Sequence, residues 1–156
     1  HKHTNMFSAS CHYGLQAMFY IAMHSTDGNN VELSEIATEQ DIPKHFLSKI
    51  LQQLVKQKLL VSMKGPTGGF KLSRPPKKIA IIDVVEAIDG LDIFRQCGSS
   101  TKECDENDPC PIHEDYKKIR ERVYHLFLTT SLEGLVGDMK NENGIAGVGK
   151  KPDQRP

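Results

Sequence analysis

Apolar residues recur at helical spacing in three segments of the first third of the chain. They predict helices over 13–24, 33–37 and 46–55, with a break at 41–43 between the second and the third. Two helices joined by such a tight break are typical of a helix-turn-helix, so the third helix is a candidate recognition helix. The side chains that we expect to face the core in that helix are Phe46, Leu47, Ile50 and Leu51.

After these helices the pattern changes to that of a β-hairpin. Residues 59–63 and 70–72 have the composition of strands, and the Gly- and Pro-containing segment 65–69 predicts the turn between them. A hairpin that directly follows a helix-turn-helix is the wing of a winged helix. The predicted fold class is therefore mainly α with a small β-hairpin wing, and residues 6–78 form a winged helix-turn-helix domain.

Beyond the wing, the pattern predicts a linker helix and then a longer helix with a narrow apolar seam. The linker helix lies within 79–96, where apolar residues recur at i, i+3, i+4 and i+7. Within 114–136, apolar residues step alternately by three and four, and the other faces are charged. Such a seam suits a partner helix, most simply that of a second copy, so we expect a long dimerisation helix and a homodimer. The seam consists of Tyr116, Ile119, Val123, Leu126 and Thr130.

The two ends of the chain have little capacity to form a core. Thr130 and Glu133 have the spacing of a capping box and predict a short terminal helix over 131–136. The Gly-, Lys- and Asn-rich tail 137–156 is expected to be disordered. Residues 1–5 lack the apolar run of a secretory signal and are interpreted as an expression remnant.

Charge is segregated along the 156-residue chain, although its 20 basic and 20 acidic residues cancel. Residues 44–78 contain nine Lys or Arg and no Asp or Glu, whereas the next block, 79–116, is strongly acidic. The basic block spans the candidate recognition helix and the wing and would attract phosphate. The alternative is a solvated basic face that the acidic block balances. No stretch approaches the roughly 18 apolar residues of a transmembrane helix, so we expect no membrane partner and a cytoplasmic location.

The basic block also suggests which residues would contact double-stranded DNA. A recognition helix presents donors from its first turns to base edges and phosphates, and a glycine-rich wing turn brings backbone amides close to the duplex. Each lysine alone could be solvated, and the glycines could simply form the turn. The combination of two helices, a wing and an acid-free stretch favours DNA. The candidate contacts are Lys44, His45, Ser48, Lys49, Lys64, Gly65, Pro66, Thr67 and Gly68.

Three cysteines and a histidine lie in a polar loop, 97–113, that offers few apolar side chains. Three thiolates and one imidazole can bind zinc or an iron-sulfur cluster. The loop lacks the tight cysteine pairs usual at zinc sites, and a thiol switch without metal is a third interpretation. The fourth cysteine, Cys11, is interpreted as a small buried side chain at a helix start. The candidate ligands are Cys97, Cys104, Cys110 and His113.

With these features placed, residues 7–136 resemble the IscR and NsrR family of bacterial winged-helix transcription regulators. The resemblance implies a homodimer that binds a pseudo-palindromic operator and carries a cluster whose state sets DNA affinity. Family members sense cluster supply, iron, nitric oxide or redox state in this way. The segments that carry the resemblance are 13–17, 36–37, 64–70, 83–85 and 132–136, together with the three cysteines of the loop.

The resemblance also implies a set of cluster ligands. Cys97, Cys104 and Cys110 match the cysteine ligands of the family, and His113 matches the fourth ligand of IscR-like proteins, which favours a 2Fe-2S over a 4Fe-4S cluster. NsrR-like proteins use an acidic residue just before Tyr-Gly on the first helix of the partner, a position that His12 occupies here. Six residues separate Cys97 from Cys104, whereas five are common in the family.

The sequence therefore predicts a dimeric DNA-binding transcription regulator whose operator affinity is set by an iron-sulfur cluster in the three-cysteine loop. The alternative is a winged-helix regulator with a structural zinc ion or a thiol-disulfide switch at the same cysteines. The sequence contains no Ser/His/Asp arrangement that can be placed and no phosphate-binding GxGxxG after a strand. We therefore expect neither enzymatic activity nor a small-molecule substrate.

Overall fold

The computed structural model describes residues 6–25, 28–97, 105–107 and 110–143. The elements follow one another as α1 (Ala9–His24), α2 (Leu33–Glu39), α3 (Lys44–Lys56), β1 (Leu60–Met63), β2 (Gly69–Leu72), the 3-10 turn η1 (Pro76–Lys78), α4 (Ile81–Asp89), the 3-10 turn η2 (Asp92–Phe94), α5 (His113–Thr129) and α6 (Leu132–Asn143). β1 and β2 pair as an antiparallel hairpin directly after α3, which confirms the predicted winged-helix class. No helix in the described ranges is long and apolar enough to span a bilayer.

Helix α1 begins four residues before the start that apolar spacing predicts. The hydroxyl of Ser8 accepts a hydrogen bond from the amide of Cys11 (3.0 Å) and so caps the helix. Ser8 is held in turn by Asp89 at the end of α4, whose carboxylate accepts hydrogen bonds from both the amide and the hydroxyl of Ser8. A contact with a distant element therefore fixes the start of α1.

The three N-terminal helices and the hairpin share one hydrophobic core. The amide and carbonyl of Val31, just before α2, exchange 2.8 Å hydrogen bonds with those of Phe70, so this segment pairs with β2. Leu132 at the start of α6 is fully buried in the same core, which ties the C-terminal part of the chain to the head, the unit formed by α1, α2, α3 and the hairpin. The largest fully buried side chains of this core are Met18, Ile21, Ile36, Leu47, Leu51, Leu54, Ile79, Val84 and Leu132.

The inward face predicted for α3 is right for three residues and wrong for Phe46. Leu47, Ile50 and Leu51 are buried, but 50% of Phe46 is exposed. Successive residues of an α-helix are about 100° apart, and the buried stripe runs from Leu47 along i+3, i+4 and i+7. Phe46 lies about 90° from the middle of that stripe. Its apolar character therefore does not place it in the core.

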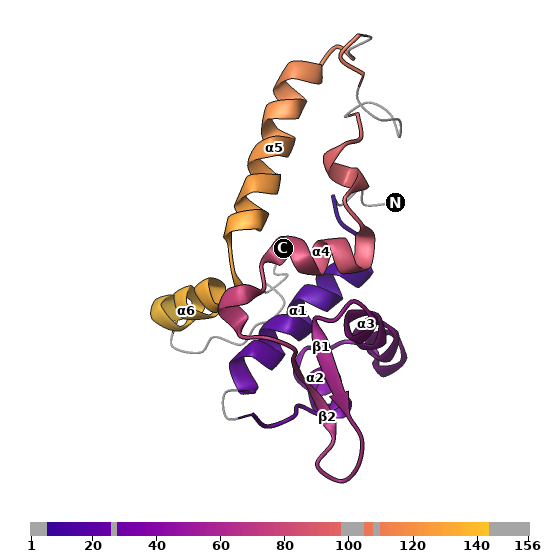
Figure 1. The fold of residues 1–156 in the computed structure, drawn as a ribbon, viewed down its shortest axis with the longest axis vertical. Helices are drawn as coiled ribbons and strands as arrows, with labels where there is room; N and C mark the ends of the chain where they lie inside the picture. Colours follow the sequence, from indigo (N-terminus) through magenta and orange to yellow (C-terminus); the bar gives the residue numbers. More distant parts are fainter. Residues whose placement is uncertain (1–5, 26–27, 98–104, 108–109, 144–156) are drawn as a thin grey trace, which may run out of the picture.

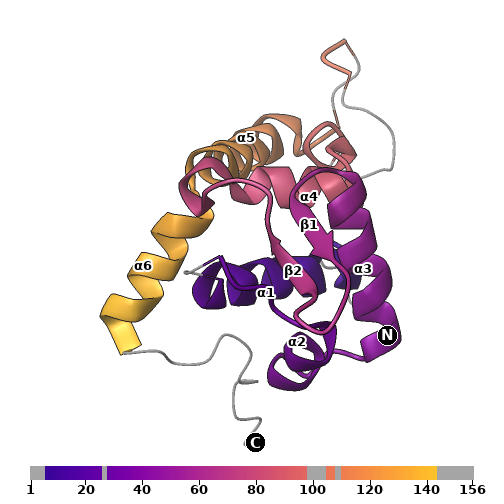
Figure 2. The same ribbon diagram turned by 60° about the horizontal axis from the view of Figure 1, so that its bottom comes forward.

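Helix α5 extends away from the head, with its first turn at the end of the molecule opposite the wing tip (Figure 1). Helix α4 packs against α1, α3 and α5, so it connects the α2–α3 region with the C-terminal helices. Helix α6 leaves in another direction and packs against α1 and η1 (Figure 2). This order of contacts places α4 between the predicted DNA-binding elements and the cysteine loop.

The prediction for the last helix is wrong in its cap and in its length. The hydroxyl that accepts from the Gly134 amide (3.1 Å) belongs to Ser131, while the Thr130 hydroxyl donates back to Leu126. Helix α6 continues to Asn143, so 137–143 is helical rather than disordered. The tail 144–156, the expression remnant 1–5 and the loop stretch 98–104 with Cys104 lie outside the described residues.

Candidate functional site

The predicted DNA contacts lie on the first turns of α3 and on the wing turn; α3 packs against β1 of the hairpin, and Figure 2 shows the two elements next to each other. On α3, Lys44, His45 and Lys49 are exposed and Ser48 is half-buried. In the hairpin, 64–67 is exposed and Gly68 is half-buried. All of these residues can therefore be reached by a large ligand without unfolding the core.

Hydrogen bonds to the backbone hold the wing turn in shape. The amide of Gly68 donates to the carbonyl of Gly65 (2.9 Å), which closes the turn. From the segment before α2, the side-chain amide of Asn30 donates to the carbonyl of Thr67 (3.0 Å). The turn that follows Lys64 is thus attached to the helical head, which suits a phosphate contact made by a lysine and backbone amides.

We predict that Lys49→Ala and Lys64→Ala each weaken binding to duplex DNA and flatten its dependence on salt. A lysine on a phosphate displaces a counterion, so each lost contact lowers the slope of log affinity against log salt by about 1. The measurement is a titration by fluorescence anisotropy at several salt concentrations. Lys78→Ala, on η1, is the control and should keep the wild-type slope. Unchanged slopes for Lys49→Ala and Lys64→Ala would remove both lysines from the interface.

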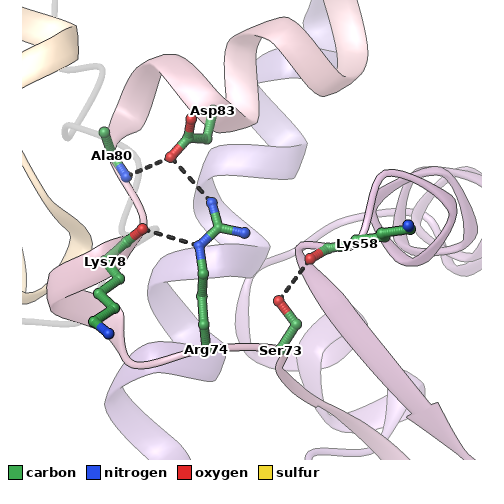
Figure 3. A network of polar contacts seen from close by, with 6 residues as sticks. All are labelled: Lys58, Ser73, Arg74, Lys78, Ala80 and Asp83. Atoms are coloured by element: carbon green, nitrogen blue, oxygen red, sulfur yellow. Dashed lines mark hydrogen bonds and ion pairs between the residues drawn. The ribbon is translucent and has the colours of Figure 1, made fainter.

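A polar network connects the base of the wing with α4 (Figure 3). After β2, the hydroxyl of Ser73 donates to the carbonyl of Lys58 (2.6 Å), just before β1. Next in the chain, Arg74 donates to the carbonyl of Lys78 (2.9 Å) and forms an ion pair with Asp83 on α4 (3.3 Å). Asp83 also accepts from the amide of Ala80 (2.9 Å) and thereby caps α4. The carboxylate of Asp83 therefore binds both Arg74, at the base of the wing, and the amide at the start of α4.

The cysteine loop meets the rest of the protein at its two ends. Cys97 and Cys110 are half-buried, and His113 is 5% exposed as the first residue of α5. The amide of His113 donates to the carbonyl of Cys110 (3.0 Å), so both side chains belong to one turn. The Nδ1 atom of His113 is buried and has no hydrogen-bond partner among the described residues.

The donor set of this loop fits a soft metal or an iron-sulfur cluster. Thiolates and a neutral imidazole are the ligands that such centres take, and the buried Nδ1 of His113, which has no partner among the described residues, is a ring nitrogen that needs a hydrogen-bond partner or a metal. Within the described ranges, no group of three or more metal-ligating side chains is assembled. Cys104, the second predicted thiolate, lies outside those ranges.

Two contacts fasten the loop to α5. The guanidinium of Arg120, a buried residue of α5, donates to the carbonyl of Gln96, directly before Cys97. Lys117 donates to the carboxylate of Glu106 (2.6 Å), which holds the pKa of Glu106 below its usual value and raises the pKa of Lys117. Glu106 is exposed and forms an ion pair with Lys117.

Cys11 is the small buried side chain that the sequence predicts. It is fully buried between α1 and α4 beside Ile81 and Val85. Burial, and secondarily the charge of Asp89, raises the pKa of its thiol to about 12. Cys11 is therefore a protonated, unreactive thiol at neutral pH, and it provides an internal control for experiments on the loop cysteines.

The predicted seam of α5 is exposed only in part. Ile119 and Leu126 are each 56% exposed and lie seven residues apart on one face of the helix. Val123 is half-buried, and so is Tyr116, whose ring lies 5.8 Å from the guanidinium carbon of Arg120. A surface hollow of about 770 Å³ lies beside the seam, at its Val123 and Leu126 end. It is lined by Lys118, Glu121, Arg122, Val123, His125, Leu126 and Thr129.

Sequence reasoning missed three features of this surface. Phe46 was assigned to the core, and the roles of Asn30 and of the Arg74–Asp83 pair were not anticipated. A helical projection of α3 could have identified Phe46, because its angle differs from that of the buried stripe. No local signal identifies the other two contacts, since they join residues that are brought together only by the fold.

Comparisons with known proteins agree with this arrangement. Residues 7–138 match the model of the Rrf2 family, described as iron-dependent transcriptional regulators. A protein of Aquifex aeolicus named an HTH-type transcriptional regulator is 31% identical over 133 residues, which are 84% of this chain and 91% of that protein. The HTH-type transcriptional regulator IscR of Xenorhabdus nematophila is 33% identical over 125 residues, covering 80% of this chain and 74% of its own.

Solved structures show the same fold. CymR, described as the global cysteine regulator of B. subtilis, matches with a TM-score of 0.71 at 25% identity, over 85% of this chain and 96% of its own. IscR of T. potens matches with a TM-score of 0.70 at 24% identity, over 87% and 89%. These relatives are transcription regulators and not enzymes. With a family model that matches most of its length, this chain belongs to the Rrf2 family of transcriptional regulators.

Proposed function

We propose that this regulator acts as a homodimer, binds its operator through α3 and the wing, and changes its operator affinity with the state of an iron-sulfur cluster. Cys97, Cys104, Cys110 and His113 are the proposed ligands. The similarity to proteins named IscR supports a cluster, and the exposed apolar face of α5 supports a dimer. The histidine favours the 2Fe-2S type, which Cys-and-His ligation is known to accommodate.

The observation that carries this proposal is the environment of His113. An imidazole nitrogen that is buried without a partner is costly, because burial removes its hydrogen bonds to water. A bound centre would use the lone pair of Nδ1, and the hydrogen bond between the His113 amide and Cys110 would hold both ligands in one turn. When bound, the cluster would supply a local charge that depends on its redox state.

The residues around the loop provide a route from this site to the DNA-binding head. Ordering of the loop would fix its start at Gln96, which Arg120 holds against α5. Helix α5 contacts α4, and Gln53 of α3 donates to the carbonyl of Ala87 in α4 (2.9 Å). A change in the placement of α5 therefore acts on the element that α3 touches. The cluster can change operator affinity only if it stabilises one placement of the two DNA-binding heads more than the other.

The test is anaerobic purification followed by a visible spectrum and by assays of iron and acid-labile sulfide. We expect about two irons and two sulfides per chain, and we expect Cys104→Ala to abolish the spectrum. Cys11→Ala is the matched control, because it removes the buried cysteine outside the loop and should keep the cluster. Values near four would indicate a 4Fe-4S cluster with another fourth ligand, such as His12. Full iron and sulfide in Cys104→Ala would disprove the ligand assignment.

A second candidate function is a zinc site or thiol-disulfide switch at the same cysteines. The observation that favours this function is the likeness to CymR, which is described as a cysteine regulator. The DNA-binding head would be the same in both functions. Metal analysis and thiol titration distinguish the two functions. Protein that holds zinc, or that forms a reversible disulfide without iron after anaerobic purification, would favour the switch.

A further inference from the structure

Phe46 is an exposed aromatic side chain at the start of the proposed recognition helix. Half of its surface is exposed, in a part of the chain that contains no Asp or Glu from residue 44 to residue 78. Ile119 and Leu126 are also exposed, but they lie on the proposed dimer face, and the exposed Val61 and Met63 lie on β1 of the wing rather than on α3. An aromatic side chain left in water on a DNA-facing helix is a candidate for contact with an apolar part of DNA.

The position of Phe46 on α3 suits such a contact. It is the third residue of the helix, and it lies between the buried stripe and the exposed side that carries His45 and Lys49. The ring of His45 packs against it, with centroids 4.2 Å apart and planes inclined by 37°. In helix-turn-helix proteins, the N-terminal residues of the recognition helix are those that reach base edges. A ligand that meets His45 and Lys49 would therefore also meet Phe46.

The chemistry of the major groove narrows what an apolar side chain can recognise there. Each base pair presents hydrogen-bond donors and acceptors, and the C5-methyl of thymine is the apolar group that distinguishes one base from another. Phe46 has no polar atom, so it cannot read donors or acceptors. The neighbouring Lys44, His45 and Lys49 supply the polar and charged contacts.

We propose that Phe46 contacts the C5-methyl of a thymine in each operator half-site and is a specificity-determining residue of this regulator. The inference rests on the proposed placement of α3 in the major groove. Removal of water from the exposed face of the ring and from the methyl group favours a thymine at one position. Other positions of the half-site are read by other side chains and do not depend on Phe46.

The experiment compares operators selected from a random duplex pool by the wild type and by Phe46→Ala. We expect the variant to lose the preference for thymine at one position of each half-site and to keep the preferences elsewhere. Deoxyuridine is then placed at that position of the wild-type operator, which removes only the methyl group. Wild-type affinity should fall about fourfold per half-site, the effect of one methyl contact, whereas the affinity of Phe46→Ala should not change.

Each other outcome has a definite meaning. A deoxyuridine operator that the wild type binds as tightly as the thymine operator would overturn the methyl contact. If Phe46→Ala loses sequence preference equally at every position, Phe46 only supports the helix. Thermal unfolding of Phe46→Ala and of the conservative variant Phe46→Leu would then measure that supporting effect. If the wild type selects no sequence at all, the proposed recognition by α3 itself fails. If the wild type and Phe46→Ala select the same operator, recognition by α3 stands and only the role of Phe46 in specificity is refuted.

Discussion

Replacement of both Ile119 and Leu126 by glutamate should convert the protein into a monomer and lower its operator affinity by roughly 100-fold or more. The two side chains are each 56% exposed on one face of α5, so in a single chain their replacement disturbs little packing. In a dimer that buries this face, four carboxylates would be placed in an apolar contact without partners. The loss of affinity follows because two linked DNA-binding heads gain a factor of 10² to 10⁴ over one head.

The measurement is sedimentation or light scattering together with an operator titration. The matched control is Glu114→Gln with Asp115→Asn, which also changes charge on α5 but at exposed positions of the first turn. The control should remain dimeric. A double glutamate variant that stays dimeric would place the interface elsewhere, whereas a monomer with unchanged operator affinity would remove dimerisation from the DNA-binding mechanism.

The second large effect is expected from Gly69→Ala at the start of β2. Gly69 has a φ of +138°, and a Cβ atom there would lie 2.5 Å from the carbonyl oxygen of Val31. Alanine would therefore strain the backbone and push β2 away from the segment that pairs with it. The loss combines strain with the two Val31–Phe70 hydrogen bonds, so the free energy of unfolding should fall by roughly 3 kcal/mol. The expected decrease in Tm is roughly 6–12 °C.

Gly65→Ala in the same hairpin is the control for that variant. Gly65 also has a positive φ (+105°), but nothing lies within 4 Å of the Cβ position. It should show the effect of backbone strain alone, and calorimetry or circular dichroism on both variants measures the difference. If Gly65→Ala is as unstable as Gly69→Ala, the close approach of β2 to Val31 is not what makes glycine necessary at residue 69.

Local sequence information was sufficient for the elements of the head. A 3.6-residue period of apolar residues predicts the buried stripe of α3. Two strand-like runs around a Gly- and Pro-containing turn predict the hairpin. These signals are local because hydrogen bonding within a helix or a two-stranded hairpin involves residues that are close in sequence. The same applies to the charge block over α3 and the wing, which is a property of composition alone.

The sequence also carries the signature of the family, because the family's motifs recur at fixed distances from one another. The resemblance to regulators of the IscR and NsrR type agrees with the Rrf2 match over residues 7–138. The resemblance implies that His113 is a ligand, but it contains no information on the burial of that residue. The buried state of Nδ1 follows from the packing of α5 and the loop.

Contacts between distant residues account for what sequence could not determine. The capping of α1 by Ser8 depends on Asp89, and the connection from the wing to α4 depends on the Arg74–Asp83 pair. The exposure of Phe46 depends on which face of α3 the core covers. Sequence alone thus determined the type and order of most elements and the chemistry available to them. Tertiary structure decided which side chains are buried and which remain free to bind, because burial is set by elements that are far apart in the chain.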